Sequence, residues 1–197
     1  ANAVAENAAV GTRVGITAQS VDADVTSNTV TYALADNAGG RFAIDASTGV
    51  VTVAGLLDAE TAQQHTLVVR AVSADGSTST LTLDITVQDV NEFGVTPVAD
   101  TDAQPERVRE ADPVGTVVGL TAQAQDRDVT DNAISYSLLD DAGGRFAIHA
   151  TSGVLTIARG LDAETAQSHT VVVRALSSDG SAQTRAWRVD VTDVDEF

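Results

Sequence analysis

The chain has 197 residues, and 43% of them are hydrophobic, which is enough for a packed core. Its 28 acidic and 11 basic residues give a formal net charge of −17, which argues against nucleic acid as a partner because phosphate binding needs a basic surface. Cysteine is absent, so disulfides and thiolate metal sites are excluded. No run of about 18 apolar residues predicts a membrane span. Without a signal peptide or Met at position 1, the sequence is expected to be a segment of a longer protein.

The sequence contains the same unit twice. Residues 6–93 align with residues 110–197 without a gap, and well over half of the aligned positions are identical. A unit of about 100 residues has the size of a domain rather than of a short solenoid repeat. Glycine, proline and polar residues in 94–105 mark a connection. We therefore predict two tandem domains, residues 1–93 and 94–197.

Alternating apolar and polar residues predict β-strands with one buried face in each unit. In the first unit the strand-like runs are 14–20, 30–34, 51–53, 65–72 and 81–87. Turn residues separate them at 38–40, 46–49 and 74–76. Only residues 57–63 have a helical composition, which predicts a single turn between strands. The pattern indicates an all-β fold, two tandem Greek-key immunoglobulin-like β-sandwiches.

Acidic residues gather at the ends of these predicted strands. If the first strand packs beside the last, one end of the first domain carries Glu6, Asp58, Glu60, Asp89 and Glu92, and the opposite end carries Asp22, Asp24 and Asp75. End-to-end domains would bring the first set to Asp126, Asp128 and Asp179 of the second domain. Carboxylates that converge repel one another unless cations neutralise them. A ligand set of oxygen atoms alone points to calcium rather than to zinc or copper.

The order and spacing of five motifs resemble a cadherin repeat over nearly the whole chain. The motifs are Glu6 to Thr12, Asp22-Ala-Asp24, Leu57-Asp58-Ala59-Glu60, a strand ending in Asp75, and Asp89-Val90-Asn91-Glu92-Phe93. The second unit repeats them from Glu110 to Phe197. The hairpin at 42–51 resembles the bacterial branch of that family, which occurs in long secreted or surface-anchored proteins.

This resemblance implies calcium ions between successive repeats. The implied ligands from the first domain are Glu6, Asp58, Glu60, Asp89, Asn91 and Glu92, with the backbone carbonyls of Val90 and Phe93. The second domain would add Asp126, Asp128 and Asp179, with a carbonyl near Asn132. Asp22, Asp24 and Asp75 would face a preceding repeat. Glu110, Asp162, Glu164, Asp193, Asp195 and Glu196 would face a following one. Glu92, Phe93 and Asp195 depart from the family's Asp-x-Asn-Asp-Asn pattern.

The same sequence also allows interpretations other than a calcium site between repeats. The acids could be a solvated surface, and an EF-hand is excluded because the segment from Asp22 lacks Gly at loop position 6 and Glu at position 12. His65 and His169 fit packed residues better than metal ligands. Trp187 fits the core or a sheet surface, with a sugar-stacking platform as the alternative. No nucleophile, base and acid stand in a recognisable arrangement, so no enzyme is expected.

The sequence therefore predicts a calcium-binding tandem module that is part of a larger extracellular or cell-surface bacterial protein. In this interpretation, calcium stiffens a stalk or adhesion segment through contacts between neighbouring repeats. The alternative function is a calcium-dependent carbohydrate-binding module that recognises polysaccharide. Homophilic contacts between copies of the chain are a third way in which the module could act.

Overall fold

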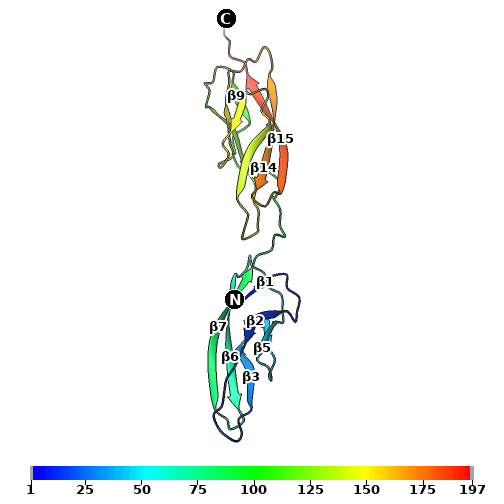
Figure 1. Cartoon of the computed structure of the whole chain (residues 1–197). Helices are drawn as coiled ribbons and strands as arrows, with labels where there is room; N and C mark the ends of the chain where they lie inside the picture. Colours follow the sequence, from blue (N-terminus) through cyan, green and yellow to red (C-terminus); the bar gives the residue numbers. More distant parts are fainter. Residues whose placement is uncertain (1, 196–197) are drawn as a thin grey trace. The chain divides into compact units, whose positions relative to one another are not determined.

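The computed structural model describes residues 2–195, and the chain divides into two compact units, with the boundary between Val90 and Asn91 (Figure 1). This division falls three residues before the boundary expected from the sequence. The described residues contain strands, turns and loops without a helix, and therefore none that is long and apolar enough to cross a membrane. Each unit is an all-β sandwich of two sheets.

The first unit packs a four-stranded sheet against a three-stranded one. The larger sheet has the order β1 (Ala3–Ala5), β7 (Thr78–Gln88), β6 (Gln64–Ser73) and β3 (Val30–Asp36). The smaller has the order β2 (Arg13–Thr17), β5 (Val50–Val53) and β4 (Phe42–Ile44). Strand β1 runs parallel to β7, whereas the other pairs are antiparallel. This pairing places the first strand beside the last. That is the condition under which Glu6 was expected to lie near Glu60 and Asp89.

The second unit has the same architecture with one additional short strand. Its first sheet has the order β11 (Ile134–Asp140), β14 (Ser168–Ser177), β15 (Ala182–Thr192) and β9 (Arg107–Arg109). Its second sheet has the order β12 (Phe146–Ile148), β13 (Val154–Ile157), β10 (Val117–Gln123) and β8 (Ala99–Asp100). Strand β8 pairs with β10, and the positions equivalent to β8 in the first unit would precede Ala1.

The cores form where the alternating residues of both sheets face each other. On β6, Leu67, Val69 and Ala71 are buried, and the side chains between them are exposed or half-buried. Trp187 on β15 is only 7% exposed and belongs to the core of the second unit, which confirms a packed role. Burying such alternating apolar side chains supplies most of the folding free energy of a sandwich.

Both strand histidines pack on a phenylalanine of the opposite sheet. The His65 ring meets Phe42 edge-on at 5.8 Å, and His169 meets Phe146 at 5.9 Å. Burial lowers the pKa of both imidazoles, with a smaller contribution from a nearby arginine. The prediction of packed histidines is confirmed. Residues 57–63 make one turn, closed by the Ala62 N–H donating to the Asp58 carbonyl at 2.9 Å.

Candidate metal sites at the ends of the domains

Four groups of three carboxylates lie at strand ends, two in each unit. In every group the oxygen atoms lie within 4.8 Å of one another. The groups are Glu6, Glu60 and Asp89; Asp22, Asp24 and Asp75; Glu110, Asp162 and Glu164; and Asp126, Asp128 and Asp179. Every one of these residues was a predicted ligand. Like charges this close favour a bound cation or a bound proton.

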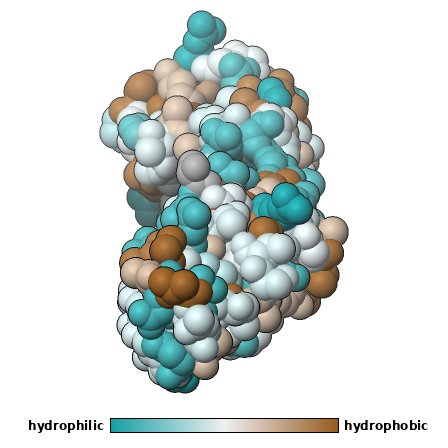
Figure 2. Space-filling model, turned by 60° about the horizontal axis from the view of Figure 1, so that its bottom comes forward, coloured by the Kyte–Doolittle hydropathy of each residue, from teal (hydrophilic) through white to brown (hydrophobic). Residues whose placement is uncertain are grey.

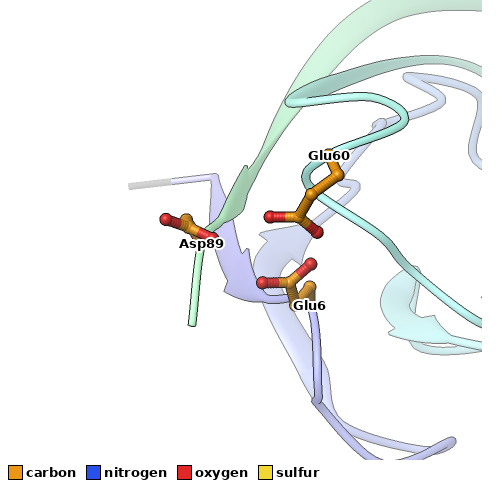
Figure 3. A group of neighbouring side chains, drawn as sticks. All are labelled: Glu6, Glu60 and Asp89. Carbon is orange, nitrogen blue, oxygen red and sulfur yellow. The ribbon is translucent and has the colours of Figure 1, made fainter. Parts of the chain in front are cut away.

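The first group, which we call the Glu60 cluster, joins three separate segments of the first unit (Figure 3). Glu6 follows β1, Glu60 lies in the turn after residue 57, and Asp89 follows β7. Figure 3 shows the Glu6 and Glu60 carboxylates facing each other, with Asp89 beside them. Glu6 is buried and accepts the Ala59 N–H at 2.6 Å and the Val90 N–H at 2.7 Å. Two backbone donors therefore fix the Glu6 carboxylate.

Glu60 is the member of the cluster whose charge is least compensated. Both of its carboxylate oxygens are shielded from water and have no hydrogen-bond partner among the described residues. Burial, together with the smaller effects of the Glu6 and Asp89 charges, raises the pKa of Glu60 to about 7. A buried carboxylate without a donor is costly unless a cation or proton compensates it. An orphaned carboxylate among oxygen ligands fits a hard cation such as calcium.

Asp58 does not belong to the Glu60 cluster. Its carboxylate instead accepts the Thr61 N–H and the Thr61 hydroxyl, both at 2.9 Å, and these bonds lower its pKa. In the second unit, Asp162 makes the same two bonds to Thr165 and also lies within the group that contains Glu110 and Glu164. The side chain of Asp58 thus organises the turn that presents Glu60.

The second unit contains an equally buried group, which we call the Asp128 cluster (Asp126, Asp128 and Asp179). Asp128 is 1% exposed, and its Oδ1 accepts the N–H groups of Glu92 at 3.2 Å and Phe93 at 3.1 Å. One oxygen each of Asp126 and Asp128 is buried without a hydrogen-bond partner among the described residues. The linking residues 91–93 therefore pack on this cluster, and two orphaned oxygens remain for a cation.

Two asparagines contact the Asp128 cluster through their amide nitrogens. Asn91 Nδ2 donates to Asp179 at 2.8 Å, and Asn132 Nδ2 donates to the Asp128 carbonyl at 2.5 Å. The Asn91 bond is the largest cause of a lowered Asp179 pKa. The sequence pointed to the oxygen of Asn91 and to a carbonyl near Asn132 as ligands. The structure brings both residues to the cluster and leaves these two assignments as predictions.

The other two groups repeat these arrangements with greater exposure. Ser73 Oγ donates to Asp22, and Asp24 and Asp75 are exposed. Glu110 is held like Glu6, by N–H groups of Ala163 and Val194 at 2.7 Å, and these bonds lower its pKa. Each group thus has a counterpart of different burial in the other unit.

The end of the second unit carries the remaining predicted ligands. A hydrogen bond from its own backbone lowers the pKa of Glu164, but the charges of Glu110, Asp193 and Asp162, together with burial, raise it overall. Asp193 and Asp195 are exposed, and Glu196 lies outside the described residues. Asp193 therefore acts on this group through its charge.

Sequence reasoning missed the serines that hold these acids. Besides the Ser73 bond to Asp22, Ser181 Oγ accepts the Val95 N–H at 3.0 Å, and the Ser181 N–H donates to Asp179 at 2.7 Å. The available signal was positional, because serine occupies these places in both repeats, as Ser73 with Ser177 and Ser77 with Ser181. A hydroxyl that recurs next to paired acids indicates a buried polar network.

Comparison with known proteins identifies the architecture. The family model described as "Cadherin domain" matches residues 2–88 and 104–192. The chain is 42% identical over 144 residues to mouse "Cadherin EGF LAG seven-pass G-type receptor 1", covering 71% of this chain and 5% of that protein. It is 31% identical over 194 residues to human Cadherin-7, covering 90% of this chain and 24% of that protein. The chain therefore spans a quarter or less of either relative.

Solved structures show the same fold. The crystal structure of mouse cadherin-23 EC22-24 superposes with a TM-score of 0.76 at 27% identity, covering 99% of this chain and 64% of that one. Protocadherin gamma B2 extracellular cadherin domains 1-5 give a TM-score of 0.81 at 22% identity, covering 98% of this chain and 38% of that one. Two family matches in tandem, together with these sandwiches, show that the chain belongs to the cadherin family as two consecutive cadherin domains.

Proposed function

We propose that the chain is a calcium-binding adhesion segment of an extracellular protein, in which calcium occupies the carboxylate clusters at the domain ends. The observation that carries the proposal is the set of buried carboxylate oxygens of Glu60, Asp126 and Asp128 that have no hydrogen-bond partner among the described residues. Cadherin domains are adhesion modules, and oxygen-only clusters suit calcium.

The Glu60 cluster and the Asp128 cluster supply the side-chain ligands in this proposal. Backbone carbonyls of Val90 and Phe93, and the side chains of Asn91 and Glu92, complete the proposed set. The four exposed members of the remaining groups (Asp24, Asp75, Asp162 and Glu164) are proposed to bind more weakly, because water screens and solvates their charges. Asp193, Asp195 and Glu196 are proposed as weak ligands of the second unit's far end.

Cations on these clusters would restrain the segment that connects the two domains. Asp89 belongs to the Glu60 cluster, and three residues later the Glu92 N–H donates to Asp128. Calcium on both clusters would therefore act on both ends of a very short segment. We propose that this restraint stiffens the connection between the two domains, and that loss of calcium leaves this connection free to bend. Extracellular calcium modules bind in the ~10⁻⁴–10⁻³ M range, so environmental calcium would control stiffness.

Calorimetric titration of the full chain with calcium, and with magnesium as the comparison ion, tests the proposal. Glu60→Gln and Asp128→Asn should each weaken calcium binding about tenfold or more, because each removes an ionised ligand whose charge is poorly solvated. Asp36→Asn is the matched control, since Asp36 lies at the end of β3 outside the four groups and accepts only a local N–H. Unchanged calcium affinity in both cluster variants would exclude the assignment.

A carbohydrate-binding function finds little support among the described aromatic residues. Phe42, Tyr136, Phe146 and Trp187 are buried, and Tyr32 is half-buried. Phe93 is exposed at 38%, so it is a single ring rather than a platform of several on which a sugar could stack. The face seen in Figure 2 shows small, separate hydrophobic groups among hydrophilic and neutral residues. A bacterial source stays part of our proposal on the basis of the hairpin at 42–51 and the absence of lysine. The curated relatives compared above are animal proteins.

A further inference from the structure

The second domain has a hollow at the seam of its two sheets, where β9 of one sheet lies beside β10 of the other. We call it the seam hollow. Its volume is about 560 Å³, which is within the size range of sites for small molecules. Residues 102–105 and Thr192, at the end of β15, complete its wall. None of its lining residues belongs to the four carboxylate groups at the domain ends, so the hollow is separate from the candidate metal sites.

One side of the seam hollow is built by a close crossing of two backbones. Gly119 has a φ of +76° where the pairing of β10 with β13 is irregular, and a Cβ there would lie 2.5 Å from the Pro105 carbonyl oxygen. Only glycine permits this approach. Val108, which is 3% exposed, and Val117, which is 51% exposed, add apolar surface to the wall. The hollow therefore has a wall that is fixed by backbone contacts and is partly apolar.

Two arginines of β9 give the seam hollow its positive charge. Arg107 and Arg109 are two residues apart, so they lie on one face of the strand with their Cα atoms about 6.5–7 Å apart. Neither guanidinium makes a hydrogen bond or an ion pair with another of the described residues. Their backbone N–H groups are already engaged, because that of Arg107 donates to the Pro105 carbonyl at 2.7 Å and that of Arg109 to Asp112 at 2.8 Å. A ligand would therefore meet the arginine side chains rather than an open strand edge.

Two half-buried aspartates line the same hollow without pairing with the arginine side chains. Asp112 Oδ2 accepts the Arg109 N–H, and Asp102 Oδ1 accepts the Gln104 N–H at 2.9 Å. Within the described part of the chain, the second oxygen of each carboxylate has no hydrogen-bond partner, and neither carboxylate forms an ion pair with a guanidinium. The seam hollow thus offers unpaired cationic donors and unoccupied acceptor oxygens to the same ligand.

The repeat shows that the fold does not require these charges. In the first domain, alanine stands at all three positions equivalent to Arg107, Arg109 and Asp112. Strand β1 nevertheless pairs in parallel with β7 in the same register as β9 with β15. Alanine therefore supports the same backbone, and packing does not account for the charged residues of the second domain. Binding of a ligand accounts for them.

We infer that the seam hollow binds an acidic saccharide, the uronate unit of a polysaccharide, which carries one carboxylate and several hydroxyl groups on each ring. The planar guanidinium groups of Arg107 and Arg109 match a carboxylate through paired hydrogen bonds. The unoccupied oxygens of Asp102 and Asp112 accept hydrogen bonds from sugar hydroxyls. An acidic peptide fits less well, because its closely spaced carboxylates would also face the two aspartates. Recognition of this kind needs no aromatic platform, and it does not rest on the proposed calcium binding.

NMR titration of the full chain with a tetramer of galacturonic acid tests this inference, and EDTA in the buffer removes any calcium that could bridge two carboxylates. The acidic tetramer should shift the amide signals of Val117 and Thr192 at about 1–10 mM, because a few exposed charged hydrogen bonds give weak binding. A neutral tetramer of galactose should bind about tenfold more weakly or not at all. Replacing both Arg107 and Arg109 by alanine should weaken binding of the acidic tetramer about tenfold or more, because both charge-assisted contacts are lost.

Arg188→Gln provides the control for charge alone. It removes one positive charge from the same sheet, but Arg188 pairs with Asp190 at 2.9 Å and does not line the seam hollow. Its affinity for the acidic tetramer should stay within about twofold of the wild type.

The double alanine variant should keep its fold, since the first domain carries alanine at both equivalent positions, and unchanged amide signals away from the hollow check this. The inference is wrong if the neutral tetramer binds as tightly as the acidic one, or if the acidic tetramer shifts no signal in the hollow. It is also wrong if the double variant binds like the wild type, or if Arg188→Gln weakens binding as much as the double variant does. Because the titration is done without calcium, each of these results leaves the proposed calcium sites untouched.

Discussion

Replacing Glu60 by glutamine should stabilise the calcium-free first domain at neutral and alkaline pH. Burial first, and then the charges of Glu6 and Asp89, hold the Glu60 pKa near 7, compared with an ordinary value of 4.5. The folded domain therefore disfavours the ionised form that the unfolded chain adopts freely. For an acid whose folded pKa is raised, this penalty is complete above pH 7 and disappears as the pH falls toward 4.5.

The size of the effect follows from the two pKa values. A carboxyl that titrates near 7 when folded and near 4.5 when unfolded destabilises the folded state by about 3 kcal/mol above pH 7. Residual water at the half-buried side chain reduces this to about 1–2 kcal/mol. Glu60→Gln removes the penalty, so the advantage of the variant should fall to less than half between about pH 8 and pH 5.5.

Calcium should make the wild-type first domain more stable than the Glu60→Gln domain, the reverse of the order expected without calcium. With a dissociation constant of ~10⁻⁴–10⁻³ M, about 10 mM calcium stabilises the folded wild-type domain by about 1.4–2.7 kcal/mol. The Glu60→Gln domain should gain much less because it has lost an ionised ligand. Amide hydrogen exchange of the buried β6 residues, measured against pH in EDTA and in calcium, reports the unfolding free energy of this domain alone.

The matched control is Glu164→Gln in the second domain, since Glu164 is the equivalent residue in the repeat but is exposed. Its substitution should change the stability of its own domain less, because water solvates the charge. A calcium-free Glu60→Gln domain that is no more stable than the wild type at pH 8 would refute the idea that Glu60 is an uncompensated charge. If the Glu60→Gln domain is still more stable than the wild-type domain in calcium, the role of Glu60 as a calcium ligand is refuted.

Three further predictions concern the cores. Ala122→Glu should destabilise the second domain by about 3 kcal/mol or more, because it buries an unpaired charge. Ala18→Glu, at the equivalent but half-buried position of the first domain, should cost far less. Denaturant unfolding of both variants decides this. Because the folded His65 pKa is lowered, the first domain should lose stability as the pH falls below 6.5, and His65→Phe should remove that loss in thermal unfolding at pH 5 and pH 7.5. Trp187→Ala should lower the unfolding free energy of the second domain by about 3–5 kcal/mol, because this side chain is buried. Leu83→Ala should lower that of the first domain clearly less, because Leu83 is half-buried. Equal losses of stability would contradict this difference in burial.

The fold followed from the sequence because its signals are local and repeated. Alternation in runs such as 65–72 and 81–87 corresponds to β6 and β7, with ends shifted by a few residues. Repetition of the unit doubled the evidence for every strand and every acid. The sequence analysis brought Glu6 to Asp89 on the condition that the first strand packs beside the last, and the structure pairs β1 with β7.

The parts that the sequence did not predict depend on distances between segments. Asp58 and Glu60 are two residues apart and look equivalent as ligands, yet Asp58 closes its own turn while Glu60 faces Glu6. Side-chain direction within a turn decides this difference, and periodicity carries no information about it. The serines beside the acids escaped notice for the same reason, since a hydroxyl acquires its role only from a partner such as Asp22.

The duplicated chain provides its own comparison of the same acids in two environments. Asp24 and Asp128 are equivalent residues in nearly identical motifs, yet Asp24 is exposed and Asp128 is 1% exposed. The difference comes from residues 92 and 93, whose N–H groups donate to Asp128. The burial of the Asp128 carboxylate therefore depends on the residues through which the chain enters its domain. If calcium occupies the Asp128 cluster as we propose, residues 92 and 93 are part of that site, because their N–H groups hold the Asp128 carboxylate.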